Sequence, residues 1–232
     1  MKTITALIYI KEKEKGLLSI AEGRGKSLVP VLGSSRIIDY YLGPIIKSNF
    51  DKVLILTDRD MTKVRDYLVY TYGSGSFKIL NTVDLFNEFM NVLRLKNGES
   101  LFIIRADGLL FQENKPLEGR LKNLTNENYK VVTEGQDLIG FYLNRSQLWQ
   151  ELKLKSKGLS FKEDESKADK LWSFLEETIS PVAKELILNG NYYSLKTVKD
   201  YYDLHFLWLR SIEKLKFQTY LLMPKDELKE KN

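Results

Sequence analysis

The chain has 232 residues, 43% of them hydrophobic, which suits one domain of ordinary α/β size with a sizeable core. It has no cysteine, which excludes a disulfide framework, a thiol nucleophile and a Cys-ligated metal site. The net charge is +5, but lysine and glutamate are mixed along the chain, whereas nucleic-acid binders usually gather basic residues in one stripe. We therefore expect no nucleic-acid partner.

Hydropathy likewise argues against an association with membranes. No apolar run approaches the roughly 18 residues that would indicate a membrane-spanning helix, so we expect no membrane partner. The first apolar run follows a single lysine and precedes a charged segment, without a small-residue cleavage site, so no signal peptide is expected. Together with the lack of cysteine, this pattern favours a cytoplasmic location.

The first half of the chain alternates predicted strands and helices. Continuous apolar runs are typical of strands covered on both faces, and they occupy Thr3–Ile10, Lys52–Thr57 and Ser100–Arg105. A shorter strand is expected over residues 77–80, and helical periodicity over residues 40–49, 61–70 and 81–95. This order predicts an α/β fold with a mixed, mostly parallel Rossmann-like sheet and helices on both faces.

The second half is less regular. Strands are predicted at Tyr129–Thr133, Leu138–Leu143 and Tyr192–Leu195. Helices are predicted over residues 146–154, 171–187 with a break or kink at Pro181, and 198–217. Residues 155–170 are interpreted as a charged loop and residues 189–191 as a turn. We expect one domain over residues 1–217 and a charged tail over residues 218–232.

Two polar residues are notable for their positions. Asp107 follows the predicted strand Ser100–Arg105, and ligands of α/β domains bind at the carboxyl ends of strands. The alternative for Asp107 is a turn residue that precedes Gly108. His205, the one histidine, lies on an apolar helical face. We interpret it as a packed or half-exposed helix residue rather than a catalytic base.

The most specific motif runs from Lys26 to Leu42 and reads Lys-x-x-Val-Pro-x-x-Gly-x-x-Arg-Ile-Ile-Asp-Tyr-x-Leu. It resembles the bacterial ADP-glucose pyrophosphorylases (glucose-1-phosphate adenylyltransferases), whose segment reads Lys-Pro-Ala-Val-Pro-Phe-Gly-Gly and then Arg-Ile-Ile-Asp-Phe. Further similar segments follow in the family's order at residues 81–86, 102–110, 139–143 and 191–201. The resemblance covers roughly residues 3–212.

The resemblance implies a sugar-phosphate nucleotidyltransferase, in which a sugar phosphate attacks the α-phosphate of ATP with the help of Mg²⁺. Lys26 would then pair with a phosphate, and Asp107 would hold the metal. Thr82 and Asp84 would lie near the base, and Arg36 is a further candidate for substrate binding.

Each of these residues also has a purely structural interpretation. Lys26 fits a solvated loop lysine, and Asp84 fits an acidic residue in the first turn of a helix, where the helix dipole stabilises it. Arg36 and Asp39 fit a local ion pair.

The departures from the family fall on its chemistry. The family's glycine-rich phosphate loop aligns with Lys11–Leu17, where only the leucine matches and glutamates replace glycines that let backbone N–H groups approach a phosphate. Ser194 stands at the second metal-binding aspartate. The family's Glu-Lys-Pro, whose lysine holds the sugar phosphate, has at best Glu134–Gln136 as its counterpart. Losing one preorganised stabiliser typically costs about 2.7–4 kcal/mol of barrier, so these losses predict little activity for the chain alone.

This pattern looks most like the non-catalytic, regulatory-type subunit of ADP-glucose pyrophosphorylase, without the family's C-terminal left-handed β-helix. The resemblance implies a catalytic pyrophosphorylase subunit or a second copy as partner, with ATP or a sugar phosphate as possible ligand. Mg²⁺ is expected only if nucleotide binding survives. Two alternatives stay open: a divergent but active Mg²⁺-dependent glucose-1-phosphate adenylyltransferase, and an interaction module without a nucleotide site.

Overall fold

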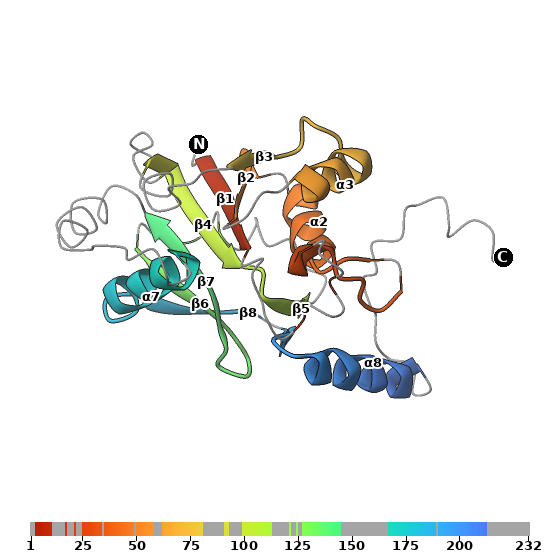
Figure 1. Ribbon diagram of the computed structural model, residues 1–232. Coiled ribbons are helices and arrows are strands. Elements are labelled where there is room, and N and C mark those ends of the chain that lie inside the picture. Colours follow the sequence, from red (N-terminus) through yellow and green to blue (C-terminus); the bar gives the residue numbers. More distant parts are fainter. Residues whose placement is uncertain are drawn as a thin grey trace.

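The computed structural model describes residues 3–10, 17, 21, 25–33, 35–48, 50–57, 62–80, 91–92, 99–112, 121, 124, 127–144, 167–188 and 190–212. Within this part of the chain, seven strands form one mixed sheet in the order β3-β2-β1-β4-β7-β6-β8 (Figure 1). Two further strands, β5 and β9, form a small second sheet. The predicted fold class, a mixed and mostly parallel Rossmann-like sheet, is confirmed.

The parallel half of the sheet is built from the apolar runs of the sequence. It consists of β1 (Thr3–Ile10), β2 (Lys52–Thr57), β3 (Lys78–Leu80) and β4 (Glu99–Arg105). β1 lies between β2 and β4 and is parallel to both, and β3 pairs in parallel with β2. All four strands therefore end at the same edge of the sheet.

The other half is antiparallel at its junction with β4. β6 (Tyr129–Thr133) and β7 (Leu138–Asn144) form a hairpin, β7 pairs antiparallel with β4, and β8 (Lys184–Leu188) adds in parallel to β6. Gly140 allows β7 to approach β4, because a Cβ at this position would lie 2.4 Å from the carbonyl oxygen of Ile103.

Two apolar cores cover the two faces of the sheet, as the period-two alternation along β1 requires. Ile4, Ala6 and Ile8 pack with residues of α2 (Asp39–Lys47) and α3 (Thr62–Tyr72), whereas Leu7 and Tyr9 pack with residues of α7 (Lys167–Ile179). Figure 1 shows α2 and α3 on one side of the sheet and α7 on the other. None of the helices in the described ranges is long and apolar enough to cross a membrane.

The small sheet connects the strand ends to the last described helix. β5 (Gly108–Gln112) pairs antiparallel with β9 (Gly190–Ser194), and α8 (Val198–Ile212) follows. A capping box begins α8: the Thr197 hydroxyl accepts from the Asp200 N–H at 3.1 Å, and the Asp200 carboxylate accepts from the Thr197 N–H at 2.8 Å.

Several predicted elements are corrected. The helix expected over residues 171–187 ends at Ile179, because Pro181 lacks the N–H that a continuing helix needs, and residues 184–188 form β8 instead. Residues 167–170, expected in a loop, begin α7. Gly190 and Asn191, expected in a turn, open β9, and its partner β5 was not predicted at all.

The other sequence-predicted strands and helices lie close to their expected positions where the structure describes them. The helix predicted at residues 81–95 is described only at residues 91–92, which are helical. The helix at residues 146–154, the loop at residues 155–166 and the tail from residue 218 lie outside the described residues. The domain boundary at residue 217 therefore stays a prediction.

Candidate functional site

The candidate site lies at the carboxyl edge of the parallel strands. β1 and β4 run in register, Tyr9 lies opposite Arg105, and the Ala106 N–H donates to the Tyr9 carbonyl at 2.8 Å. Asp107 follows immediately, at the edge where α/β proteins bind their ligands. The predicted position of Asp107 at a strand end is therefore confirmed. Its contacts show how far its carboxylate is free to bind a ligand.

The carboxylate of Asp107 is occupied by groups of the protein itself. The Arg105 Nε atom lies 2.6 Å from Oδ2, and the Tyr192 hydroxyl donates to Oδ1. The Arg105 guanidinium also lies over the ring of Trp172, 5.4 Å from its centre, which holds the cation in place. A buried carboxylate with a fixed cation beside it needs no metal ion to balance its charge.

Lys26 reaches the same point from a different segment. It opens the 3₁₀ turn Lys26–Leu28, is only 1% exposed, and donates from Nζ to the backbone carbonyl of Asp107 at 2.7 Å. The alternative of a solvated loop lysine is therefore wrong. The structure brings Lys26 and Asp107 together, and the ammonium group holds the backbone of the chain.

Tyrosine hydroxyls complete this polar centre. The Tyr41 hydroxyl, from α2, donates to the Gly108 carbonyl at 2.8 Å and accepts from the Gly108 N–H at 3.3 Å. Burial, followed by the negative charge of Asp107, raises the pKa of Tyr41. Burial and the proximity of Tyr41 and Asp107 likewise raise the pKa of Tyr192. Both hydroxyls therefore keep their protons and act as hydrogen-bond donors.

Gly108 permits this close packing. A Cβ at Gly108 would lie 2.3 Å from the Tyr193 carbonyl oxygen and 2.8 Å from the Tyr192 ring. Ser194, which the resemblance aligned with a metal-binding aspartate, pairs directly with Gly108 across the small sheet. The fold thus places Ser194 beside Asp107, with a hydroxyl as its polar group.

Glu134–Gln136, which the resemblance aligned with a sugar-phosphate-binding segment, forms a hairpin turn. Glu134–Gln136 connects β6 to β7, with all three residues exposed, Gln136 at a φ of 68° and its N–H bonded to the Thr133 carbonyl at 2.9 Å. The turn carries no basic side chain, so whether it takes part in ligand binding stays a prediction.

These donors do not fit a Mg²⁺ site. Mg²⁺ in nucleotidyl transfer is usually held by one or two carboxylates, with water and phosphate oxygens completing an octahedron. Both oxygens of Asp107 already have partners, and the second position is Ser194. Among the residues that the structure describes, no group of three His, Asp or Glu side chains could hold a metal ion.

Arg36 lies at a different place. Together with Leu28, Lys63 and Tyr67 it lines a cavity of about 300 Å³, and its guanidinium lies 6.0 Å from the centre of the Tyr67 ring. Arg36 therefore contributes to a basic hollow between the 3₁₀ turn and α3, apart from the polar centre around Asp107.

The Arg36–Asp39 ion pair suggested by the sequence is corrected. It is the backbone N–H of Arg36, at 2.6 Å, that donates to the Asp39 carboxylate. The hydroxyls of Tyr67 and Tyr72 donate to the same carboxylate at 2.6 and 2.9 Å. Asp39 thereby ties α2 to α3.

His205 behaves as predicted, as a partly buried helix residue. Its Nδ1 lies 2.7 Å from the Tyr201 carbonyl, and its Nε2 accepts from the Leu32 N–H at 3.3 Å. Because a carbonyl only accepts and an N–H only donates, the ring is held as the Nδ1–H tautomer. Thr82, Asp84 and the loop Lys11–Gly16 lie outside the described residues.

Sequence reasoning missed three residues of the polar centre: Arg105, Tyr192 and Tyr41. Arg105 could have been identified, because the side chain of an arginine two residues before an aspartate at a strand end can reach that carboxylate. Tyr192 is 85 positions from Asp107, so its contact depends on the pairing of β5 with β9, which the sequence pattern did not predict.

No family model and no curated protein matches this chain. Similar solved structures do exist. The CTP:phosphocholine cytidylyltransferase LicC from Streptococcus pneumoniae has a TM-score of 0.63 and 16% identity, covering 90% of this chain and 100% of that chain. A protein assigned as glucose-1-phosphate thymidylyltransferase from Bacillus anthracis has a TM-score of 0.59 and 11% identity, covering 88% and 95%. A UDP-glucose pyrophosphorylase complexed with UDP-glucose has a TM-score of 0.58 and 13% identity, covering 90% and 99%.

These similarities extend over nearly the whole length of each neighbour. At such low sequence identities they show a shared fold and nothing more. The chain therefore has the Rossmann-like fold of the nucleotidyltransferases.

Proposed function

We propose that this chain is a non-catalytic, regulatory-type subunit linked to ADP-glucose synthesis. The observation that carries the proposal is the occupied carboxylate of Asp107, with Arg105 on one oxygen and Tyr192 on the other. In nucleotidyl transfer the protein mainly positions the reactants and places cations against phosphate charge. Here both carboxylate oxygens of Asp107 already have partners within the protein.

The chemistry of the surrounding residues supports the same conclusion. Lys26 holds a backbone carbonyl, and Ser194 offers a neutral hydroxyl where a second carboxylate would bind metal. A neutral hydroxyl does not balance the charge of a divalent cation, so the pair Asp107 and Ser194 is a weak replacement for two aspartates. A divergent, active Mg²⁺-dependent adenylyltransferase is the alternative. It would need the contacts of Asp107 with Arg105, Tyr192 and Lys26 to rearrange.

The choice of ADP-glucose rests on the motif at residues 26–42. The structural neighbours include a protein named for CTP and phosphocholine and one complexed with UDP-glucose, so this fold serves several nucleotides and phosphorylated partners. The Arg-Ile-Ile-Asp segment of the motif folds as an ordered part of this chain, at the start of α2. ATP and glucose-1-phosphate are therefore the first ligands to test.

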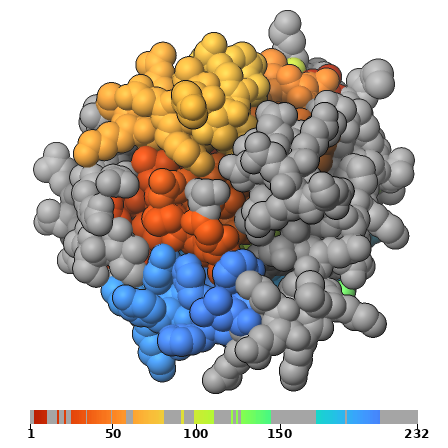
Figure 2. All heavy atoms as spheres, turned by 90° about the vertical axis from the view of Figure 1, so that its right-hand side faces the viewer, coloured from red at the N-terminus to blue at the C-terminus, as the bar shows by residue number. Residues whose placement is uncertain are grey.

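A surface suited to subunit assembly supports the regulatory role. Tyr202, Phe206 and Leu209 follow the i, i+4, i+7 spacing on α8, and each side chain is more than half exposed. Figure 2 shows α8 at the surface, on the same face as α3 and separated from it by the segment around residues 25–48. A catalytic pyrophosphorylase subunit is the proposed partner, and a second copy of the chain is the other candidate.

Two measurements test whether the chain is catalytic. The first is titration calorimetry with ATP and Mg²⁺, repeated with glucose-1-phosphate, and the second is an assay for ADP-glucose. We expect no turnover. Turnover that disappears in the variant Asp107→Asn would establish the divergent-enzyme alternative. Binding of ATP tighter than about 100 µM, roughly 5.5 kcal/mol, without turnover would identify a regulatory nucleotide site.

The regulatory question needs the partner. The purified chain is mixed with a catalytic pyrophosphorylase subunit, and co-elution and the rate of ADP-glucose formation are measured. We expect co-elution and a changed rate, both reduced by Phe206→Glu and unaffected by Lys199→Glu, which alters charge at another exposed position of α8. Co-elution without any change in rate would favour the interaction-module alternative.

A further inference from the structure

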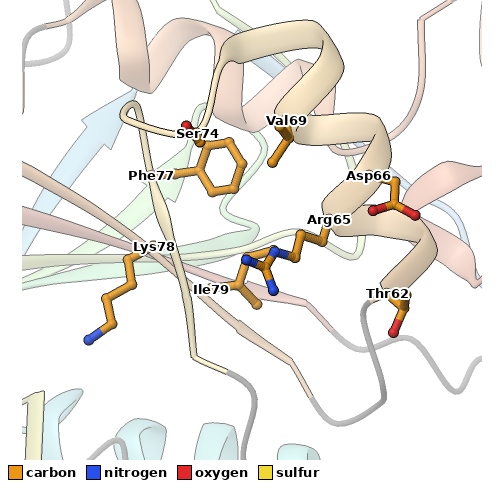
Figure 3. A pocket seen from close by; sticks show the side chains of 8 residues that line it. All are labelled: Thr62, Arg65, Asp66, Val69, Ser74, Phe77, Lys78 and Ile79. Atoms are coloured by element: carbon orange, nitrogen blue, oxygen red, sulfur yellow. The ribbon is translucent and has the colours of Figure 1, made fainter.

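A second cavity lies away from the polar centre, at the outer edge of the main sheet. It has a volume of about 400 Å³ and is enclosed by α3, the turn that follows it, and β3 (Figure 3). Two strands, β2 and β1, separate β3 from β4 and Asp107. The cavity therefore does not belong to the site discussed above.

The floor of the cavity is apolar. Phe77 and Ile79 alternate along the chain and both pack partly against the core on the α3 side of the sheet. Val69 of α3 is 38% exposed and lines the same space, and Figure 3 shows the Phe77 ring turned toward it. These side chains leave an apolar surface for one or two further side chains.

The walls are held in shape by hydrogen bonds. Gly73 ends α3 at a φ of 80°, and its N–H donates to the Val69 carbonyl at 3.0 Å. The Ser76 hydroxyl donates to the Tyr72 carbonyl at 2.7 Å. The turn from Gly73 to Ser76 is thus fixed, so the cavity exists before any ligand arrives.

Arg65 supplies a charge at this apolar floor. Figure 3 shows its side chain reaching from α3 toward Ile79 on β3, while the Asp66 carboxylate stays over the helix. Within the described part of the chain, Arg65 has neither a hydrogen-bonded nor an ion-paired partner. An arginine fork beside an apolar surface matches a carboxylate carried by an otherwise apolar segment.

The backbone of β3 provides the third element of a site. β3 is the outermost strand of the sheet on this side and pairs in parallel with β2. Among the residues that the structure describes, no strand pairs with its other edge. An exposed strand edge next to side-chain pockets is the arrangement in which proteins bind extended peptides by strand addition.

We infer that this edge binds an extended, acidic segment of a partner protein as an added strand. Side chains on one face of a strand repeat every two residues, about 7 Å apart. The segment that fits therefore carries an apolar side chain for Phe77 and Val69, and a carboxylate two residues away for Arg65. A second copy of this chain fits poorly, because it would bring another Lys78 and Arg65 against the same basic edge.

A selection from a phage-displayed library of random linear peptides tests this inference, with the immobilised chain as target and Arg65→Glu as counter-target. We expect enriched peptides to share the apolar-any-acidic pattern. One of them, resynthesised with a fluorophore, should bind the native chain at least about tenfold more tightly than Arg65→Glu, about 1.4 kcal/mol by fluorescence polarisation.

Lys199→Glu makes a charge change on α8 and should keep full peptide affinity, while Arg65→Gln provides a milder variant should Arg65→Glu misfold. Enriched peptides without an acidic residue, equal binding to all variants, or no enrichment above background would each overturn the inference. Dimerisation of the chain that is lost in Arg65→Glu would also overturn it, since the edge would then pair with a second copy.

Discussion

Two buried aspartates, Asp39 and Asp107, show how the same side chain is used for different ends. Each is 6% exposed. Asp39 accepts only from neutral donors: the Arg36 N–H and the hydroxyls of two tyrosines of α3. Asp107 instead faces the guanidinium of Arg105 and a single tyrosine hydroxyl.

The difference separates a carboxylate that joins two helices from one that is paired with a cation at the strand edge. Asp39 lies in the first turn of α2, where the positive end of the helix stabilises its charge, and its partners tie α2 to α3. Asp107 lies at the strand edge, where the guanidinium of Arg105 balances its charge. A carboxylate with neutral partners tolerates a neutral isostere better than one paired with a cation.

Removing the Asp107 carboxylate should have the largest effect. Asp107→Ala leaves Arg105 without its counter-charge beside a buried edge, and breaking a buried ion pair typically costs about 3–5 kcal/mol. Because Arg105 is partly exposed, we expect a loss near the low end, about 3 kcal/mol in the free energy of unfolding. Urea denaturation followed by circular dichroism measures it. A loss under about 1 kcal/mol would mean that the ion pair does not hold this edge together.

Asp39→Ala should cost less, about 2 kcal/mol, because it leaves neutral donors without an acceptor rather than a bare cation. Asp39→Asn keeps one acceptor oxygen and should cost about 1 kcal/mol, whereas Asp107→Asn should cost nearly as much as Asp107→Ala. The same denaturation series measures all four variants. If Asn and Ala were equally costly at position 39, the contrast between the two sites would fail.

Single hydroxyl deletions sharpen the contrast further. Tyr192→Phe and Tyr72→Phe each remove one hydrogen bond to a carboxylate, for which we expect a loss of about 1.5 kcal/mol. Combined with the aspartate variants in double-mutant cycles, both pairs should show coupling. Additive losses for Tyr192→Phe with Asp107→Ala would show that this hydroxyl does not depend on the carboxylate.

Just above pH 10, alkaline titration gives a small difference without changing either aspartate. Burial and its neighbours raise the pKa of Tyr192 above its ordinary value of 10, so the unfolded chain loses this proton first as the pH rises. Stability from Tyr192 is therefore complete below pH 10 and declines above it, by up to about 1.4 kcal/mol per pH unit. Tyr192→Phe should flatten this decline in denaturation at stepped pH. Tyr70→Phe, at a side chain 93% exposed, is the control and should leave the slope unchanged.

Much of the main sheet could be predicted because its strands are local patterns. The apolar run Lys52–Thr57 is buried on both faces and forms a strand at the expected residues. β8 was missed because its sequence, Lys-Glu-Leu-Ile-Leu, continues a helical periodicity, and only Pro181 and pairing with β6 make it a strand. β5 was missed because its partner β9 lies some eighty residues away.

The sequence by itself determined the α/β class, the position of Asp107 at a strand end, and the resemblance of the segment 26–42 to nucleotidyltransferases. These are properties of hydrophobic period and of single positions, which need no distant contact. Only the tertiary structure decided how the site is used. Lys26 lies 81 positions from the carbonyl that it binds, and Tyr192 lies 85 positions from the carboxylate that it occupies. Contacts over such distances arise from strand pairing and packing, where a local pattern carries no information about the partner.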